Sequence, residues 1–155
     1  MDITQIKPIA YAKTYQIPVK MQAAELVRRD LRAELEELKL ERRLEYQILL
    51  CIDEALSNAI EHGSLRMDAV VEIAYTLGPE VVEVAVTDFG GFVFNPEYFE
   101  RLATVKDWGE GGRGILLIKT YMDEVYFVFH PGKSTRVIMR KNIQAMNEQQ
   151  KVKVT

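Results

Sequence analysis

The sequence lacks the features of a disulfide-stapled, membrane-spanning or polyanion-binding protein. Its 155 residues include one cysteine, Cys51, so no disulfide can form within the chain, which favours a reducing compartment. No apolar run approaches the ~18 residues that a transmembrane helix needs. The 23 acidic and 20 basic side chains give a net charge of −3, whereas proteins that bind nucleic acid usually carry a basic excess.

The first residues also lack the basic and apolar segments of a secretory signal, so we expect a soluble, cytoplasmic protein. With 48% hydrophobic and 28% charged residues the composition is that of an ordinary globular chain, long enough for one domain and short for two. We therefore expect a single domain over residues 1–155, with its core at about 15–141 and a frayed tail from 142 to 155.

The first half of the chain has the patterns of one strand followed by two helices. Apolar residues alternate over 15–20, which predicts an edge strand, where Pro18 is tolerated. Apolar residues then recur at three- and four-residue spacing over 24–38, which predicts an amphipathic helix. A second helix is expected over about 44–62, with Gly63 placed to end it.

The second half contains two predicted hairpins with a long loop and a short helix between them. The expected segments are a hairpin over 71–77 and 82–88, a glycine-rich loop over 89–112, a helix over 115–122 and a hairpin over 125–129 and 135–140. A loop of that length in so small a domain is usually a lid or a binding loop. This element order predicts an α+β fold, a two-layer sandwich of helices on one face of a mainly antiparallel sheet.

One face of the second predicted helix carries residues that could take part in a reaction or bind a metal ion. At about 100° per residue, Glu54 and Asn58 lie one turn apart and point the same way, with Asp53 and Ser57 beside them. A carboxylate beside a neutral amide fits a hydroxyl that must lose a proton next to a hard cation with oxygen ligands. The alternative is that these residues only form the solvated face of an amphipathic helix.

Two glycine clusters favour a site for a phosphate-bearing ligand. Asp88-Phe-Gly-Gly-Phe92 follows a predicted strand directly, and Gly109-Glu-Gly-Gly-Arg-Gly114 directly precedes a predicted helix. Glycine lets backbone N–H groups approach a phosphate closely, and a helix N-terminus adds partial positive charge. An aspartate at a strand end can accept a hydrogen bond from the exocyclic amine of adenine. Either cluster alone could be a plain turn or connector. Both clusters follow, in a fixed order, the helix that contains Glu54 and Asn58, and this combination favours a ligand site.

These motifs resemble those of the ATPase superfamily that includes DNA gyrase B and the sensor histidine kinases, whose histidine kinase-like (Bergerat) fold is an α+β sandwich. The run Glu54-Ala-Leu-Ser-Asn-Ala-Ile-Glu-His62 is similar to its N-box, and the two glycine clusters are similar to its two glycine boxes. Thr135 matches the threonine that backs the adenine aspartate. The length and the segment Met122-Asp-Glu-Val125 are most similar to the anti-sigma factor serine kinases of bacteria.

The resemblance implies a role for each matching residue. Glu54 would be the general base toward the attacking hydroxyl, and Asn58 would hold Mg²⁺ against the triphosphate of ATP. Asp88 would read the adenine amine, Gly90 would shape the adenine pocket and Thr135 would support Asp88. The residues that would cradle the phosphates at a helix start are Gly112, Arg113 and Gly114. A short ATP lid would occupy 95–110.

The resemblance further implies a biological activity. It is ATP-dependent phosphorylation of a serine on an anti-anti-sigma protein and sequestration of a sigma factor, usually by a homodimer, without direct contact with nucleic acid or membrane. One departure is Phe92, which stands where the first glycine box has its second glycine. Either Gly91 has moved one place, or Phe94-Asn-Pro96 has shifted by one residue. A nucleotide-gated protein-binding module, or a switch kinase without sigma binding, therefore stays open as an alternative.

Overall fold

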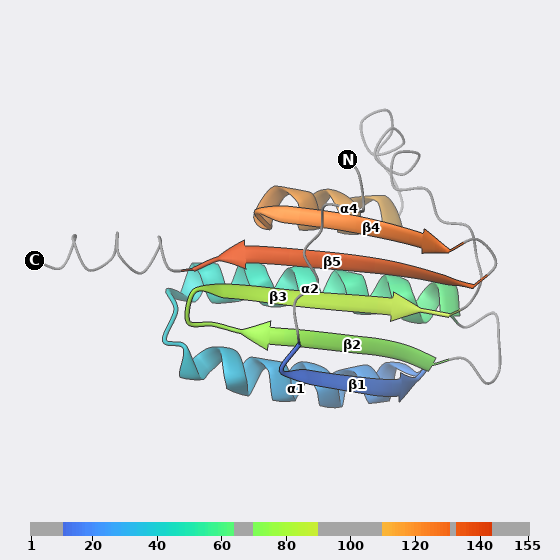
Figure 1. The fold of residues 1–155 in the computed structure, drawn as a ribbon, viewed down its shortest axis with the longest axis horizontal. Helices are drawn as coiled ribbons and strands as arrows, with labels where there is room; N and C mark the ends of the chain where they lie inside the picture. Colours follow the sequence, from blue (N-terminus) through green and yellow to red (C-terminus); the bar gives the residue numbers. More distant parts are fainter. Residues whose placement is uncertain (1–10, 64–69, 90–109, 131–132, 144–155) are drawn as a thin grey trace, which may run out of the picture.

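The computed structural model describes residues 11–63, 70–89, 110–130 and 133–143. Over these ranges the chain forms two layers, with one five-stranded sheet and three helices behind it (Figure 1). The elements are β1 (Lys13–Pro18), α1 (Met21–Glu37), α2 (Arg42–Gly63), β2 (Val70–Leu77), β3 (Val81–Asp88), α4 (Glu110–Tyr121), β4 (Glu124–His130) and β5 (Ser134–Asn142). The predicted α+β sandwich and the predicted element order are confirmed.

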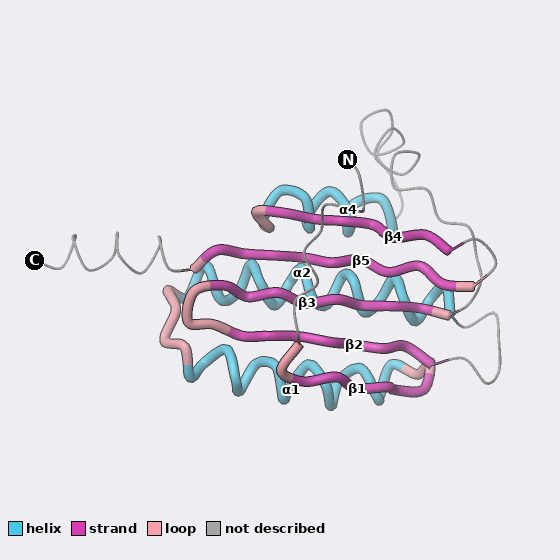
Figure 2. Tube along the Cα trace, viewed as in Figure 1, coloured by secondary structure: helices cyan, strands magenta, loops and turns pink. Residues whose placement is uncertain are grey.

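The strands follow the order β1-β2-β3-β5-β4, and every neighbouring pair is antiparallel. The three helices cover the same face of this sheet (Figure 2). Because β5 is inserted between β3 and β4, the last hairpin adds to the sheet with its second strand innermost. This arrangement brings the end of β3 next to the start of β5.

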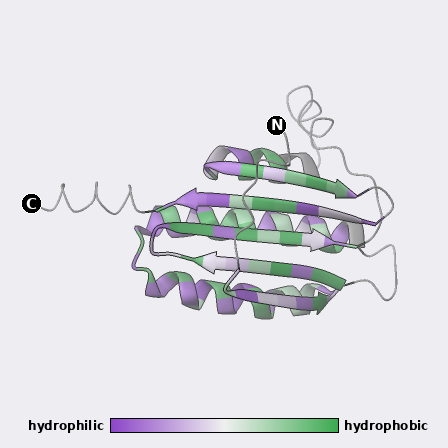
Figure 3. Ribbon diagram, in the orientation of Figure 1, coloured by the Kyte–Doolittle hydropathy of each residue, from purple (hydrophilic) through white to green (hydrophobic). Residues whose placement is uncertain are grey.

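The core lies between the sheet and the helices. Hydrophobic residues fill the middle of β4 and β5, shown green in Figure 3, while both ends of β5 are hydrophilic. In β3, Val82, Val84 and Val86 face the helices and are buried. Leu31 and Leu35 on α1 are fully buried beneath the sheet, and each such side chain contributes about 1.5–3 kcal/mol through burial.

The turn between β2 and β3 requires a glycine. Gly78 has φ of +62°, a conformation that side chains disfavour, and its N–H donates to the carbonyl of Val81 over 2.7 Å. A Cβ atom at this position would lie 2.6 Å from Cδ2 of Leu38, which follows α1. The turn therefore packs directly against the end of α1.

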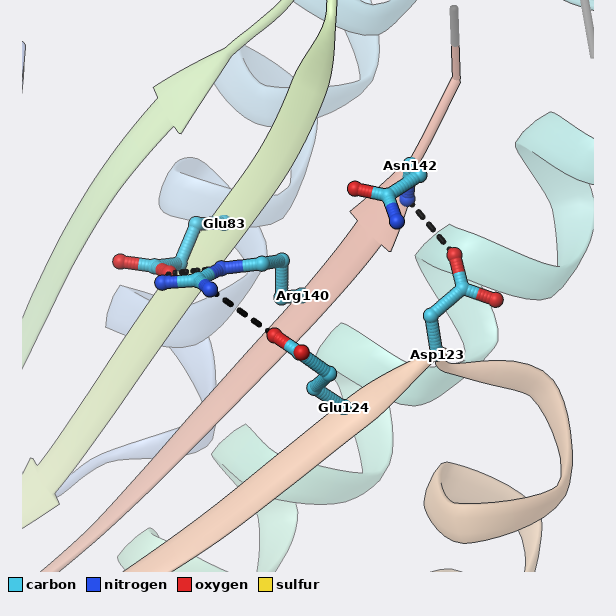
Figure 4. Close-up of polar contacts among 5 residues, drawn as sticks. All are labelled: Glu83, Asp123, Glu124, Arg140 and Asn142. Atoms are coloured by element: carbon cyan, nitrogen blue, oxygen red, sulfur yellow. Dashed lines mark hydrogen bonds and ion pairs between the residues drawn. The ribbon is translucent and has the colours of Figure 1, made fainter. Parts of the chain in front are cut away.

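On the face of the sheet away from the helices, an ionic network fixes β4 in the sheet (Figure 4). Nε of Arg140 on β5 donates to Oε1 of Glu83 on β3 over 2.6 Å, and Nη1 donates to Oε2 of Glu124 on β4 over 2.8 Å. Glu83 is 2% exposed, so its charge needs this partner. At the same end of β4, Asp123 Oδ2 accepts the N–H of Asn142 over 2.7 Å. Three strands are thus tied together at the end away from Asp88.

Several boundaries differ from the sequence predictions; β1 begins at Lys13 and α1 at Met21, before the expected residues 15 and 24. Helix α4 begins at Glu110 rather than near Ile115, so Gly111, Gly112 and Gly114 of the second cluster belong to its first turns. The core also extends two residues beyond the expected boundary at 141, because Asn142 belongs to β5 and Ile143 is fully buried. Gly90 lies outside the described residues, as does the predicted lid apart from Glu110.

Candidate functional site

A pocket lies between α2, α4 and the strands β3, β5 and β4. Its lining is mostly apolar and consists of Ala55, Asn58, Ala59, Val86, Asp88, Ile115, Ile118, Phe127, Thr135 and Val137. Three polar residues therefore interrupt an apolar surface, which is the usual composition of a small-molecule site. These three, Asn58, Asp88 and Thr135, are among the residues that the sequence predicts for ATP binding.

Asp88 and Thr135 face each other across two strands. Asp88 is the last residue of β3 and pairs in register with Thr135 near the start of β5. Their exposed fractions are 4% and 9%, so both side chains are shielded from bulk water. Directly opposite residues of an antiparallel pair have Cβ atoms about 4.5–5.5 Å apart, close enough for a hydroxyl to support a carboxylate. The Asp88 carboxylate is therefore held on the side of the pocket that the sheet forms.

Helix α2 contains both Glu54 and Asn58. Asn58 lines the pocket, and Glu54 lies one turn earlier on the helix, outside the lining. Both side chains are half-buried, as are Asp53 and Ser57 beside them. Of these four residues, Asn58 is the one that lines the pocket and so does not lie on a purely solvated helix face.

An ion pair connects α1 and α2 next to Glu54. Nε of Arg28 lies 2.5 Å from Oδ1 of Asp53. Burial raises the pKa of the Asp53 carboxyl, and the Arg28 guanidinium opposes part of that rise. The pair fixes the position of α1 against α2 at the turn from which Glu54 extends.

Cys51 lies on the buried side of α2, as the sequence predicts. Its side chain is fully buried, and its thiol points toward the carbonyl of Leu117 on α4 at 3.8 Å. Burial raises the pKa of this thiol to about 12, so it stays protonated at neutral pH. The predicted burial of this thiol is confirmed.

The remaining predicted residues divide into two groups. Gly112, Arg113 and Gly114 occupy the first turns of α4, and the next residue, Ile115, lines the pocket. The start of this helix therefore borders the site. Gly90 lies outside the described residues. Among the described residues, no group of three or more His, Cys, Asp or Glu side chains forms a metal site.

Comparison with known proteins defines the class. Residues 17–141 match the model of the histidine kinase-like ATPase domain, so the chain belongs to that family. The superfamily resemblance seen in the sequence is thereby confirmed. In the described part of the chain, no helix combines the length and apolar character that crossing a bilayer requires.

Individual relatives point to a narrower group within the family. The anti-sigma F factor of Clostridium acetobutylicum is 28% identical over 103 residues, which is 65% of this chain and 72% of that protein. The serine-protein kinase RsbW of Listeria monocytogenes is 28% identical over 145 residues, 88% of each chain. These names agree with the predicted resemblance to anti-sigma factor serine kinases. A chain in the SiaB-SiaC complex from Pseudomonas aeruginosa has the same fold, with a TM-score of 0.62 at 10% identity over 84% of this chain and 89% of that one.

Proposed function

We propose that this protein is an anti-sigma factor with ATP-dependent protein serine kinase activity. In this proposal it phosphorylates an anti-anti-sigma antagonist and, when that antagonist is phosphorylated, retains a sigma factor. The observation that carries the proposal is the convergence of Asn58, Asp88 and Thr135 on one pocket, with Glu54 one helical turn away. Family membership and the similarity to RsbW support it.

The described residues fit an adenine nucleotide. The apolar walls suit a planar base, and the Asp88 carboxylate offers only hydrogen-bond acceptors, which match an exocyclic amine. Guanine has a carbonyl oxygen at the corresponding position, and two acceptors would repel each other. The N-terminus of α4, which contains Gly112 and Gly114, would receive the phosphates through its free N–H groups.

The residues also fit a magnesium ion held jointly with the nucleotide. The amide oxygen of Asn58 is a hard ligand, and Mg²⁺ commonly takes one or two protein oxygens with phosphates and water completing the shell. When bound, ATP supplies the phosphoryl group that is transferred. Arg113 would add positive charge near the phosphates, a role that rests on its position in the first turns of α4.

Glu54 would act on the protein substrate. Its carboxylate accepts the proton of the substrate serine hydroxyl as that oxygen bonds to the γ-phosphorus and the bond to the leaving ADP breaks. The Arg28–Asp53 pair holds the adjacent turn of α2 in place, so that Glu54 and Asn58 keep their relative positions. We further propose that the protein is a homodimer and that it acts in the cytoplasm. Light scattering on the purified protein tests the homodimer.

The experiment combines phosphotransfer with binding. Glu54→Gln is expected to lower serine phosphorylation of a candidate antagonist at least ~100-fold, the usual contribution of a general base. Its affinity for ATP, measured by calorimetry with magnesium, should stay within about twofold because the side chain keeps its shape. Ser57→Ala, on the same helix and outside the pocket lining, is the control and should change neither quantity.

Three outcomes would refute or redirect the proposal. A wild-type protein that binds no adenine nucleotide would refute it. Tight ATP binding without phosphotransfer to any antagonist would favour the second candidate, a nucleotide-gated binding module, which Phe92 in the first glycine box supports. Transfer without capture of a sigma factor would favour a switch kinase.

A further inference from the structure

The turn between α4 and β4 is fastened to the end of β5, and the function described above assigns no role to this contact. The turn contains Asp123, which belongs to the sequence segment Met122-Asp-Glu-Val125. The N–H of Asp123 donates to the carbonyl of Arg140 over 2.9 Å, and Oδ2 of Asp123 accepts the N–H of Asn142 over 2.7 Å (Figure 4). Nζ of Lys141 lies 3.4 Å from Oδ1 of the same carboxylate. Three consecutive residues of β5 thus hold one aspartate.

Lys141 also holds the last turn of α4. It pairs in register with Val82, which is fully buried in the core, so both side chains lie on the face of the sheet that the helices cover. Its Nζ donates to the carbonyl of Tyr121, the last residue of α4, over 2.9 Å, and its side chain is 16% exposed. A cation is favourable at a helix C-terminus, where free carbonyl oxygens carry partial negative charge, and a charged donor strengthens the hydrogen bond. Lys141 therefore joins α4, the following turn and β5.

This contact can set the direction of α4 as a whole. A helix of 12 residues is a rigid rod about 18 Å long, and the middle of this one is buried in the core through Ile115 and Ile118. Three of its first five residues are glycines, which have no side chains to pack against neighbouring elements. The direction of the rod is therefore set mainly by packing in its middle and by the hydrogen bonds at its C-terminal end.

We infer that Lys141 and Asp123 are positioning residues that act through α4, by keeping its N-terminus directed at the triphosphate of the bound nucleotide. The inference rests on the proposed function, in which that N-terminus receives the phosphates. A positioned group that is misplaced by about 1 Å can lose most of its effect, so a small change in the direction of α4 is enough to weaken the contact with phosphate. The base, read by Asp88 on β3, would be affected much less.

Two substitutions that change the charge in opposite directions test this inference. Lys141→Met removes a positive charge and Asp123→Ala removes a negative one, and each releases part of the contact between the turn and β5. A direct effect of either charge on the phosphates, already weakened by screening at physiological salt, would have opposite signs in the two variants. Loosening of α4 would weaken ATP binding in both.

The test measures dissociation constants of the full-length variants with magnesium at physiological salt, well below the thermal midpoint. Calorimetry is used for ATP, and competition against ATP is used for adenosine, which has the base but no phosphates. Each variant should bind ATP about tenfold more weakly, the effect of losing one hydrogen bond to a charged group, and adenosine within about twofold of wild type. A merely structural role would lower the thermal midpoint without changing the ratio of the two affinities.

Two further variants serve as rescue and control. Lys141→Arg keeps a charged donor that can reach the carbonyl of Tyr121, so it should restore most of the ATP affinity that Lys141→Met loses. Asn142→Ala keeps the backbone N–H that donates to Asp123, so it should change neither dissociation constant. Circular dichroism checks that the variants fold, and should Lys141→Met or Asp123→Ala not fold, Lys141→Gln and Asp123→Asn carry the same comparison.

Each outcome separates this inference from the proposed function. If wild type binds ATP and either variant binds it equally well, or loses ATP and adenosine in parallel, the inference is wrong and the kinase proposal stands. If Asp123→Ala strengthens ATP binding while Lys141→Met weakens it, the effect is one of charge and the inference is again wrong. If wild type binds no ATP, both are wrong.

Discussion

Asp88→Asn is the sharpest perturbation of the site because it changes charge and hydrogen-bonding pattern without changing shape. The carboxylate is 4% exposed at the sheet edge of the pocket. An asparagine there presents one acceptor and one donor, so rotation of the amide cannot reproduce two acceptors. Loss of a hydrogen bond to a charged group costs about 1.5–3 kcal/mol, which corresponds to a roughly 10- to 100-fold weaker affinity for ATP.

The same substitution should relax base selection. The new amide N–H₂ can donate to the carbonyl oxygen of guanine, so the preference for ATP over GTP should fall along with the affinity for ATP. The thermal midpoint of the nucleotide-free variant should stay within roughly 3 °C of wild type, since burying a neutral amide costs less than burying a carboxylate. Calorimetric titration with each nucleotide, and thermal unfolding followed by circular dichroism, measure both effects.

Thr87→Val is the matched control for Asp88→Asn. Thr87 is the neighbouring residue on β3, is also buried, and points to the face away from the pocket. Its hydroxyl has no hydrogen-bond partner among the described residues, so its removal should cost little stability and leave nucleotide binding unchanged. If Asp88→Asn bound ATP within twofold of wild type, the assignment of Asp88 as the adenine-reading residue would be refuted.

Two further predictions address the metal and the thiol. Asn58→Ala should remove the difference between ATP affinity with and without magnesium, and retention of that difference in calorimetry would show that the ion is held elsewhere. Cys51, whose pKa is raised from 9.0 to about 12, should have a thiolate fraction about 1000-fold lower than an exposed cysteine at pH 8. Reaction with a chromogenic disulfide reagent should therefore be very slow in the native protein and fast in denaturant, and rapid native labelling would contradict the buried position.

Apolar spacing was enough to predict the helices but not all of their ends. Leu31 and Leu35 recur at the helical period, and their complete burial is what that period implies. The start of α4 could not be found in this way, because Glu110-Gly-Gly-Arg-Gly114 contains no apolar residue and glycine disfavours a helix. Helix propensity is therefore least informative for the residues that would bind phosphate.

The candidate site depended on different information for different residues. Helical geometry alone placed Glu54 and Asn58 on one face, whereas Thr135 was connected to Asp88 only through the family resemblance. The position of Phe127 in the pocket could not be predicted, since the two-residue period of a strand shows which residues share a face but not which strand lies alongside. That neighbour depends on the order β3-β5-β4, which sequence periodicity does not specify.

Helix α2 explains why an acid and an amide can be held at the edge of an apolar core. Ile48, Ile52 and Leu56 are buried beneath the sheet and fix the rotation of the helix about its axis. A helix that rotates to expose them would lose several kcal/mol of burial energy, far more than solvation of two side chains could return. Packing on the opposite side of the same helix therefore sets both the direction in which Asn58 points and its partial burial. In the proposed function, packing would position the acid and the amide before ATP binds, so binding would not have to orient them.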